Sequence, residues 1–86
     1  MTDVKQQIIE NICYTELVYK RINKKLLTEF SNGQIELLIK QILNKTDEKF
    51  YTKTGKNFYV TNTVDNIRIT INSNTFRVIT ADKIEE

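Results

Sequence analysis

The fold is decided by a six-residue stretch in which apolar and polar side chains alternate strictly, Ile67-Arg68-Ile69-Thr70-Ile71-Asn72. This period of two is typical of a half-buried β-strand, because successive side chains point to opposite faces of a sheet. The stretch Thr75–Ala81 follows and predicts the next strand, with Ser73 and Asn74 at the tip of a hairpin.

This tip fixes a predicted register for the hairpin. The expected pairs on the apolar face are Ile71 with Phe76, Ile69 with Val78, and Ile67 with Thr80. The expected pairs on the polar face are Thr70 with Arg77 and Arg68 with Ile79. We favour this register because it gathers the large apolar pairs on one side, as a half-buried hairpin requires.

Upstream of this hairpin, the sequence predicts one or two more antiparallel strands. The stretch 58–63 also alternates, and a short β-prone stretch lies at 50–52. A turn is predicted around Gly55, over residues 54–57, and a second one at residues 64–66. The sheet is therefore expected to be a meander of three or four strands over residues 48–82.

The first half of the chain has helical periodicity. Apolar residues from Ile35 to Leu43 recur at helical spacing, and Ser31 and Gln34 have the spacing of a capping box, so we expect a helix ending near Asn44. Before it, one apolar stripe is formed by Val4, Ile8, Ile12, Tyr19, Ile22, Leu26 and Phe30. This stripe fits either one long helix or two helices with a kink near Tyr14, the second capped by Thr15.

These elements predict an α+β two-layer sandwich in the order ααβββ, with N-terminal helices packed on the antiparallel sheet. We expect one domain over residues 1–86, helical over 3–44. The chain has 86 residues, and 13 Lys+Arg against 11 Asp+Glu give a net charge of +2, which indicates no particular partner.

The residues that are missing exclude several kinds of site. The sequence has no His and one Cys, which rules out Ser-His-Asp and Cys-His catalysis, His-ligated metals, an internal disulfide and a four-cysteine zinc site. We expect no cofactor, no metal and no membrane span, and a cytoplasmic location, which suits a lone Cys. Cys13 itself is expected to be a small buried hydrophobe on a helix.

Three stretches together resemble a small bacterial family, domain of unknown function 3781. They are Tyr14-Thr15-Glu16-Leu17 with Arg21-Ile22, then Gly55–Val60, then Ile69–Asn72 leading to Ile79–Lys83. The resemblance covers about residues 14–83. It implies the same order of elements and a bacterial cytosolic setting, and it implies no activity.

The polar face of the predicted sheet is the first candidate site. Arg68, Thr70, Asn72, Thr75 and Arg77 should project from the last hairpin, with Tyr59 or Phe58 beside them and Lys56 nearby. Arginine forks bind phosphate and aromatic rings stack on bases, so this face is a candidate for binding nucleic acid. The plainer interpretation is a solvated sheet face.

A basic run on the helices is the second candidate site. Lys20, Arg21, Lys24 and Lys25 fill one outer helix face. Such a face can steer an anionic partner, and it is also common as a solvated helix surface.

Function is therefore predicted as a non-catalytic module that binds a protein or nucleic acid, with no catalytic residues assigned. The alternative is a histidine-free ribonuclease of the RelE-like kind, using Lys56, Tyr59, Arg68, Arg77 and Lys83. A homodimer is a further prediction. It would form through the open edge of the last strand or through an aromatic patch drawn from Tyr14, Tyr19, Tyr51 and Phe30.

Overall fold

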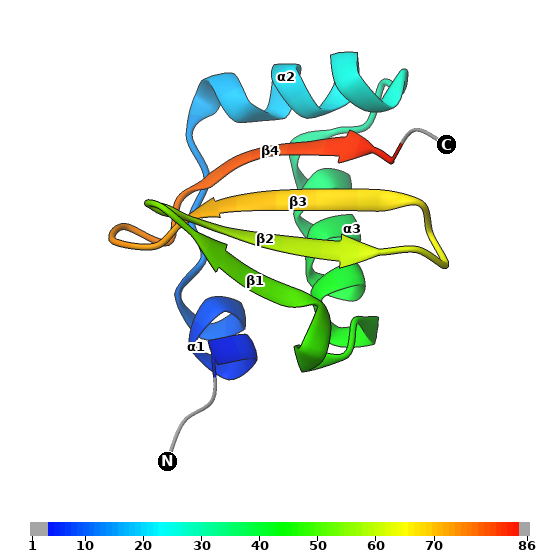
Figure 1. The fold of residues 1–86 in the computed structure, drawn as a ribbon. Coiled ribbons are helices and arrows are strands. Elements are labelled where there is room, and N and C mark those ends of the chain that lie inside the picture. Colours follow the sequence, from blue (N-terminus) through cyan, green and yellow to red (C-terminus); the bar gives the residue numbers. More distant parts are fainter. Residues whose placement is uncertain (1–3, 85–86) are drawn as a thin grey trace.

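The computed structural model describes residues 4–84 and shows helices first and an antiparallel sheet second (Figure 1). The helical elements are α1 (Val4–Asn11), α2 (Glu16–Leu26), α3 (Asn32–Lys45) and the short 3-10 helix η1 (Glu48–Phe50). The strands are β1 (Tyr51–Thr54), β2 (Asn57–Asn62), β3 (Ile67–Asn72) and β4 (Val78–Lys83). The predicted α+β class is confirmed.

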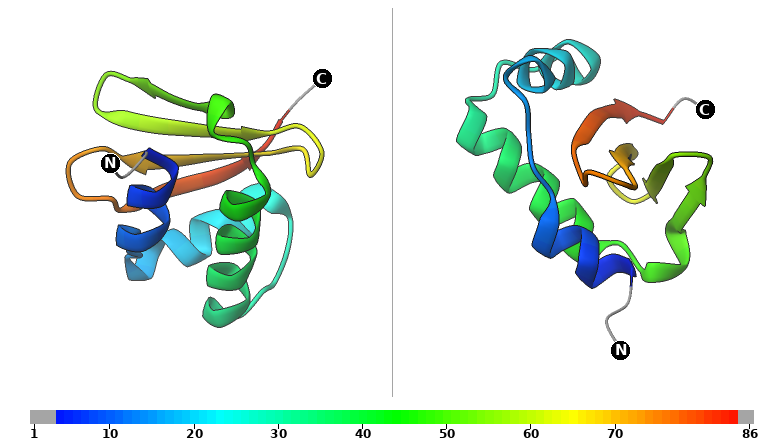
Figure 2. Two further views of the ribbon diagram at one scale, coloured as in Figure 1. Left: turned by 90° about the horizontal axis from the view of Figure 1, so that it is seen from below. Right: turned by 90° about the vertical axis from the view of Figure 1, so that its left-hand side faces the viewer.

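The four strands form an open antiparallel sheet in the order β1-β2-β3-β4. In Figure 1, α3 lies behind the sheet and α2 runs alongside β4, the last strand. Figure 2 shows that the helices gather on one side, so the other face of the sheet is left uncovered.

The core lies between the helices and the inner face of the sheet. Ile8 of α1, Ile22 of α2 and Ile39 of α3 are fully buried against Val60 and Ile69 of the sheet. Burying a side chain of this size stabilises the fold by roughly 1.5–3 kcal/mol each. This apolar packing holds α2 beside β4.

The helix that begins at Asn32 confirms the predicted capping box. The Ser31 hydroxyl accepts from the Gln34 backbone N–H, and the Gln34 side chain accepts from the Ser31 N–H. The helix ends at Lys45, one residue after the predicted end, and the cap residue Thr46 has an extended backbone.

Helices α1 and α2 are separate, so of the two predicted alternatives, one long helix or two helices, the second holds. The chain between Asn11 and Glu16 is extended, so the single apolar stripe is broken there. Cys13 lies in this extended link, where its N–H donates to the Phe76 carbonyl and its carbonyl accepts from the Val78 N–H. The prediction that Cys13 is buried on a helix is therefore wrong, because it is exposed in a connecting segment.

The predicted register of the last hairpin is also wrong. Ile71 pairs with Val78, not with Phe76, and Ile69 pairs with Ala81. Strand β4 runs over Val78–Lys83 and does not begin at Thr75, and a bulge lies at Thr70 and Ile71. The other pairs are Ile67 with Lys83, Arg68 with Asp82 and Thr70 with Thr80.

The turn explains this shift. The Asn72 side-chain oxygen accepts from the backbone N–H groups of Asn74 and Thr75, which stabilises a longer turn than the predicted two-residue tip. Phe76 then adopts a left-handed conformation, with φ of 57°. Its ring stacks on Phe58 with centroids 6.3 Å apart, so Phe76 joins the core from the turn rather than from the strand.

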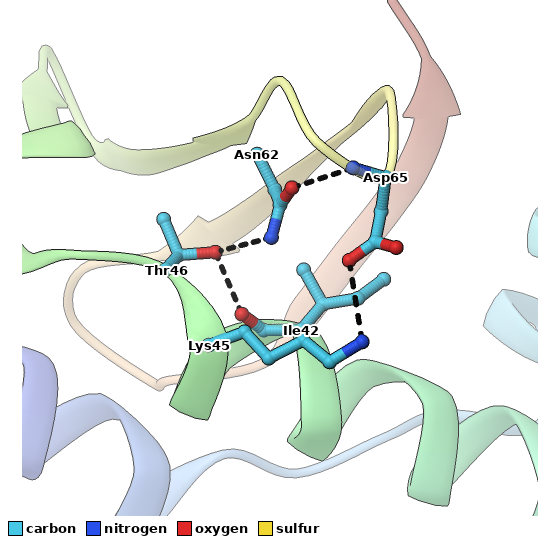
Figure 3. A network of polar contacts seen from close by, with 5 residues as sticks. All are labelled: Ile42, Lys45, Thr46, Asn62 and Asp65. Atoms are coloured by element: carbon cyan, nitrogen blue, oxygen red, sulfur yellow. Dashed lines mark hydrogen bonds and ion pairs between the residues drawn. The ribbon is translucent and has the colours of Figure 1, made fainter.

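One buried polar network ties the end of α3 to the turn between β2 and β3 (Figure 3). The Asn62 amide donates to the Thr46 hydroxyl at 3.0 Å, and the Thr46 hydroxyl donates to the Ile42 carbonyl at 2.6 Å. The Asn62 oxygen accepts from the Asp65 N–H at 2.7 Å. Lys45 and Asp65 add an ion pair of 3.7 Å.

Candidate nucleic-acid interface

The basic run lies on the outer face of α2. Its four cations are exposed and line one shallow hollow: Lys20, Arg21, Lys24 and Lys25. The inner face of the same helix buries Val18, Ile22 and Leu26, and this apolar packing turns the cations outward.

A second hollow lies where the start of α2 meets the start of β4. Its lining includes Arg21 and Arg77 together with Leu17, Val18 and Ile79. The Arg21 guanidinium donates a hydrogen bond to the Ile79 carbonyl at 3.2 Å, which keeps this side chain at the hollow. Arg77 therefore lies near the basic run.

A third hollow lies at the other end of α2, against the ends of β3 and β4. Lys25, Arg68 and Lys83 line it together with Asp82. Asp82 lies opposite Arg68 in the sheet and forms an ion pair of 3.9 Å with Lys25. With the Lys25 side chain 56% exposed, this pair is a weak surface contact that an anion can displace.

The three hollows join into one surface, because they share Arg21 and Lys25. We call this surface the basic band; it consists of Lys20, Arg21, Lys24, Lys25, Arg68, Arg77 and Lys83. Among residues 4–84, Asp82 is the one carboxylate that lines these hollows. Both predicted sites, the polar sheet face and the basic run, contribute to the band. Arg77 lines the same hollow as Arg21 at one end, and Arg68 lines the same hollow as Lys25 at the other.

The rest of the predicted polar face lies on the uncovered side of the sheet. Tyr59 is half-buried opposite Thr70, and Arg68 lies opposite Thr61. Thr70 is only 7% exposed, so it offers a partner little surface. Tyr59 and Arg68 are the members of this face that can contact a ligand.

Three predicted residues lie at the ends of the strands. Lys56 is exposed in the turn between β1 and β2, and its carbonyl accepts from the Ser73 N–H. Asn72 is the last residue of β3, and its side chain holds the backbone of the turn before β4, to which Thr75 belongs. The prediction that Thr75 projects from a strand is wrong, because its residue lies in this turn.

Most of the aromatic residues proposed for a dimer patch make contacts within the molecule itself. Tyr14 and Tyr19 stack with centroids 5.6 Å apart, and the Tyr19 hydroxyl donates to Glu36 at 2.7 Å. Burial raises the pKa of Tyr14, helped by the negative charge of Glu36. Tyr51 donates its hydroxyl to the Leu43 carbonyl at 2.6 Å.

The edge of β4 also makes contacts within the molecule. Arg21 contacts the Ile79 carbonyl and Cys13 forms a bridge beside Arg77, so part of this edge is covered by the chain itself. Phe30 remains 37% exposed and Leu27 83% exposed near the loop after α2. Homodimerisation stays a prediction, and less of the β4 edge is open to a second copy than we expected.

Within residues 4–84, no group of three or more His, Cys, Asp or Glu side chains is arranged to hold a metal ion. Over the same range, no helix has the length and apolar character needed to cross a bilayer.

Comparison with known proteins gives one match. A family model described as "Protein of unknown function (DUF3781)" matches residues 6–82, which is most of the chain. No curated protein and no solved structure matches it.

Proposed function

We propose that this chain, which belongs to the DUF3781 family of unknown function, is a non-catalytic module. It binds single-stranded nucleic acid along the basic band. The observation that carries the proposal is the merging of two separate cationic stretches into one surface. In the part of the chain that the structure describes, seven cations and one carboxylate line the three hollows, although the whole chain has a net charge of only +2.

The dimensions of the band suit a phosphate backbone. Helix α2 has 11 residues, which corresponds to about 16 Å of helix axis at 1.5 Å per residue. The four cations of this helix lie between Lys20 and Lys25, and the band continues onto β3 and β4. Exposed Lys and Arg side chains bind phosphates chiefly by releasing condensed counterions, so the contact tolerates many sequences.

The uncovered sheet face supports a single strand as the partner. Tyr59 lies on this face two residues before Thr61, which pairs with Arg68 of the band. Aromatic side chains next to a cationic track let unpaired bases stack while the phosphates follow the cations. A single strand exposes its bases for this contact, whereas a duplex hides them.

The binding assay uses a fluorescent ten-nucleotide RNA and measures its anisotropy at several salt concentrations. If four to six phosphates are contacted, log K should fall against log salt with a slope of about −3 to −4. No binding at low salt, or binding that salt does not weaken, would contradict the proposal. A DNA strand of the same sequence tests for a preference between the two sugars.

The alternative function is the histidine-free ribonuclease. Its five groups are spread out. Arg68 and Lys83 share one hollow, and Arg77 lines another. Tyr59 lies within β2, and Lys56 lies in a turn at an end of the sheet. This spread favours binding over cleavage, because general acid–base chemistry needs its groups within reach of one phosphate. Incubation of the same RNA followed by a gel distinguishes the two, since the binding proposal requires intact RNA.

A protein partner and a bacterial cytoplasmic setting remain part of the proposal. In that setting the exposed Cys13 thiol stays reduced. Homodimerisation is tested by light scattering at high protein concentration. We expect a dimer if exposed Leu27 and Phe30 meet in a second copy, and a monomer would overturn it.

A further inference from the structure

The hollow at the start of α2 differs from the rest of the basic band. It has a volume of about 330 Å³ and contains two arginines, Arg21 and Arg77, and no carboxylate of residues 4–84 lines it. Its remaining walls are mostly apolar and include Leu17, Val18 and Ile79. Two guanidinium groups beside an apolar wall suit a ligand with one strongly charged end and one flat or apolar end.

Both arginines are attached to backbone held from several sides. The Arg21 guanidinium is anchored on the Ile79 carbonyl at 3.2 Å. The Arg77 carbonyl accepts from the Asn72 N–H, and its neighbours Phe76 and Val78 bond to Cys13. Within residues 4–84, the Arg77 guanidinium makes no hydrogen bond or ion pair of its own, so its fork is available to a ligand. The anchored Arg21 guanidinium loses less entropy when a ligand arrives, because it is held in position beforehand.

Thr15 adds a donor at the same place. It occupies the cap position of α2, lines the hollow, and makes no side-chain capping bond. The first N–H groups of a helix and its dipole favour an anion at this end, and Glu16 in the first turn already meets part of that preference. These features support the two arginines, which are the principal ligands.

We propose that this hollow binds a terminal phosphate monoester of a nucleic-acid strand, with the adjoining nucleotide against the apolar wall and the following phosphates along the basic band. The inference rests on the proposed function. A monoester carries close to two negative charges at pH 7, with three oxygens available, whereas each internal diester carries one charge. Paired arginine forks therefore distinguish the end of a strand from its interior.

The test compares three ten-nucleotide RNAs of one sequence: one with a 5′-phosphate, one with a 3′-phosphate, and one with hydroxyls at both ends. We expect one phosphorylated strand to bind at least fivefold more tightly than the unphosphorylated strand. This preference should shrink between pH 7.5 and pH 5.5, because the monoester takes up a proton near pH 6. The identity of the favoured strand shows which end enters the hollow.

Matched variants locate the effect. Arg77→Gln should remove the preference and weaken the unphosphorylated strand only by the loss of one band cation. The variant should fold, since the Arg77 side chain has no partner among residues 4–84. Lys24→Gln removes the same charge from the band outside the hollow, and it should weaken all three strands while the preference remains. Circular dichroism checks that each variant folds, and Arg21→Gln serves as the second variant for the hollow.

The outcomes separate the two proposals. Equal affinity for all three strands overturns the terminal-phosphate site and leaves the proposed function standing. Failure of every strand to bind at low salt overturns both. A free nucleoside monophosphate that binds as tightly as the favoured strand overturns the strand end as the source of the phosphate. A preference that survives both arginine substitutions also overturns the assignment to this hollow.

Discussion

At the scale of single residues, the molecule combines an apolar core with a few polar side chains that have defined partners. Asn62 is 6% exposed and Thr46 is 3% exposed, and each is hydrogen-bonded (Figure 3). A buried polar group left without its partner costs far more than the bond contributes when made. Such residues are therefore the sensitive positions of the interior.

Replacing Asn62 by Ala should destabilise the fold by about 1–3 kcal/mol, because it leaves the Asp65 N–H without its acceptor and removes the donor to Thr46. Urea unfolding followed by circular dichroism measures the change. The exposed neighbour Thr63→Ala is the control and should shift the free energy of unfolding by less than about 0.5 kcal/mol. Equal small effects for both variants would show that the network contributes little.

The tyrosine pair predicts a loss of stability at alkaline pH. Burial raises the pKa of Tyr14, and desolvation with the hydrogen bond to Glu36 raises the pKa of Tyr19. The unfolded chain loses these protons near pH 10, and the folded chain keeps them to higher pH. The contribution of these two tyrosines to the free energy of unfolding is therefore fully present below pH 10 and is lost as the pH rises further.

The Tyr14→Phe variant tests this sign. Its free energy of unfolding should fall less steeply above pH 10 than that of the unmodified chain, because one titrating group is gone. Urea unfolding at pH 8 and at pH 11 gives the comparison. Identical slopes in the two proteins would mean that Tyr14 titrates normally in the folded state.

At the scale of elements, helix ends and turns decide how the chain is arranged. Helix α2 ends at Leu26, and its C-cap Leu27 is a non-glycine residue with φ of 59° that is also 83% exposed. A left-handed conformation costs a residue with a Cβ roughly 1–2 kcal/mol, and glycine is the usual occupant of this position. The chain carries a strained, exposed leucine at this position.

Leu27→Gly should therefore stabilise the protein by about 0.5–1 kcal/mol, after part of the relief is offset by the greater freedom of glycine in the unfolded chain. Thermal unfolding measures the difference. Leu37→Gly is the matched control: Leu37 is 58% exposed within α3, and its replacement should cost about 1 kcal/mol. Destabilisation by both variants would rule out strain at Leu27.

The elements also show how far the sequence alone could predict this fold. Local patterns were sufficient where local chemistry decides, as at the Ser31–Gln34 capping box and the turn at Gly55, whose φ is 62°. The hairpin register was predicted wrongly because the Asn72 side chain stabilises a longer turn. Alternation of side chains constrains the face of a strand, and turn chemistry sets the pairing.

At the scale of the whole molecule, the basic band depends on a contact that no local pattern reveals. The sequence predicted Arg68 and Arg77 on one face and the α2 cations on another. Only the packing of α2 beside β4 (Figure 1) joins them. Lys83 lines the same surface. The position of a helix along a sheet edge follows from burial of the whole core, so the continuous surface could not have been inferred from spacing.

The central claim is that nucleic acid binds along this band, and paired charge deletions test it most directly. Arg68→Ala with Arg77→Ala removes two cations from the band, and Lys49→Ala with Lys53→Ala removes two near β1, the opposite edge of the sheet. Anisotropy of the ten-nucleotide RNA at low salt should show at least tenfold weaker binding for the first pair and less than twofold for the second. Equal weakening by both pairs, or no weakening by the first, would contradict binding along the basic band.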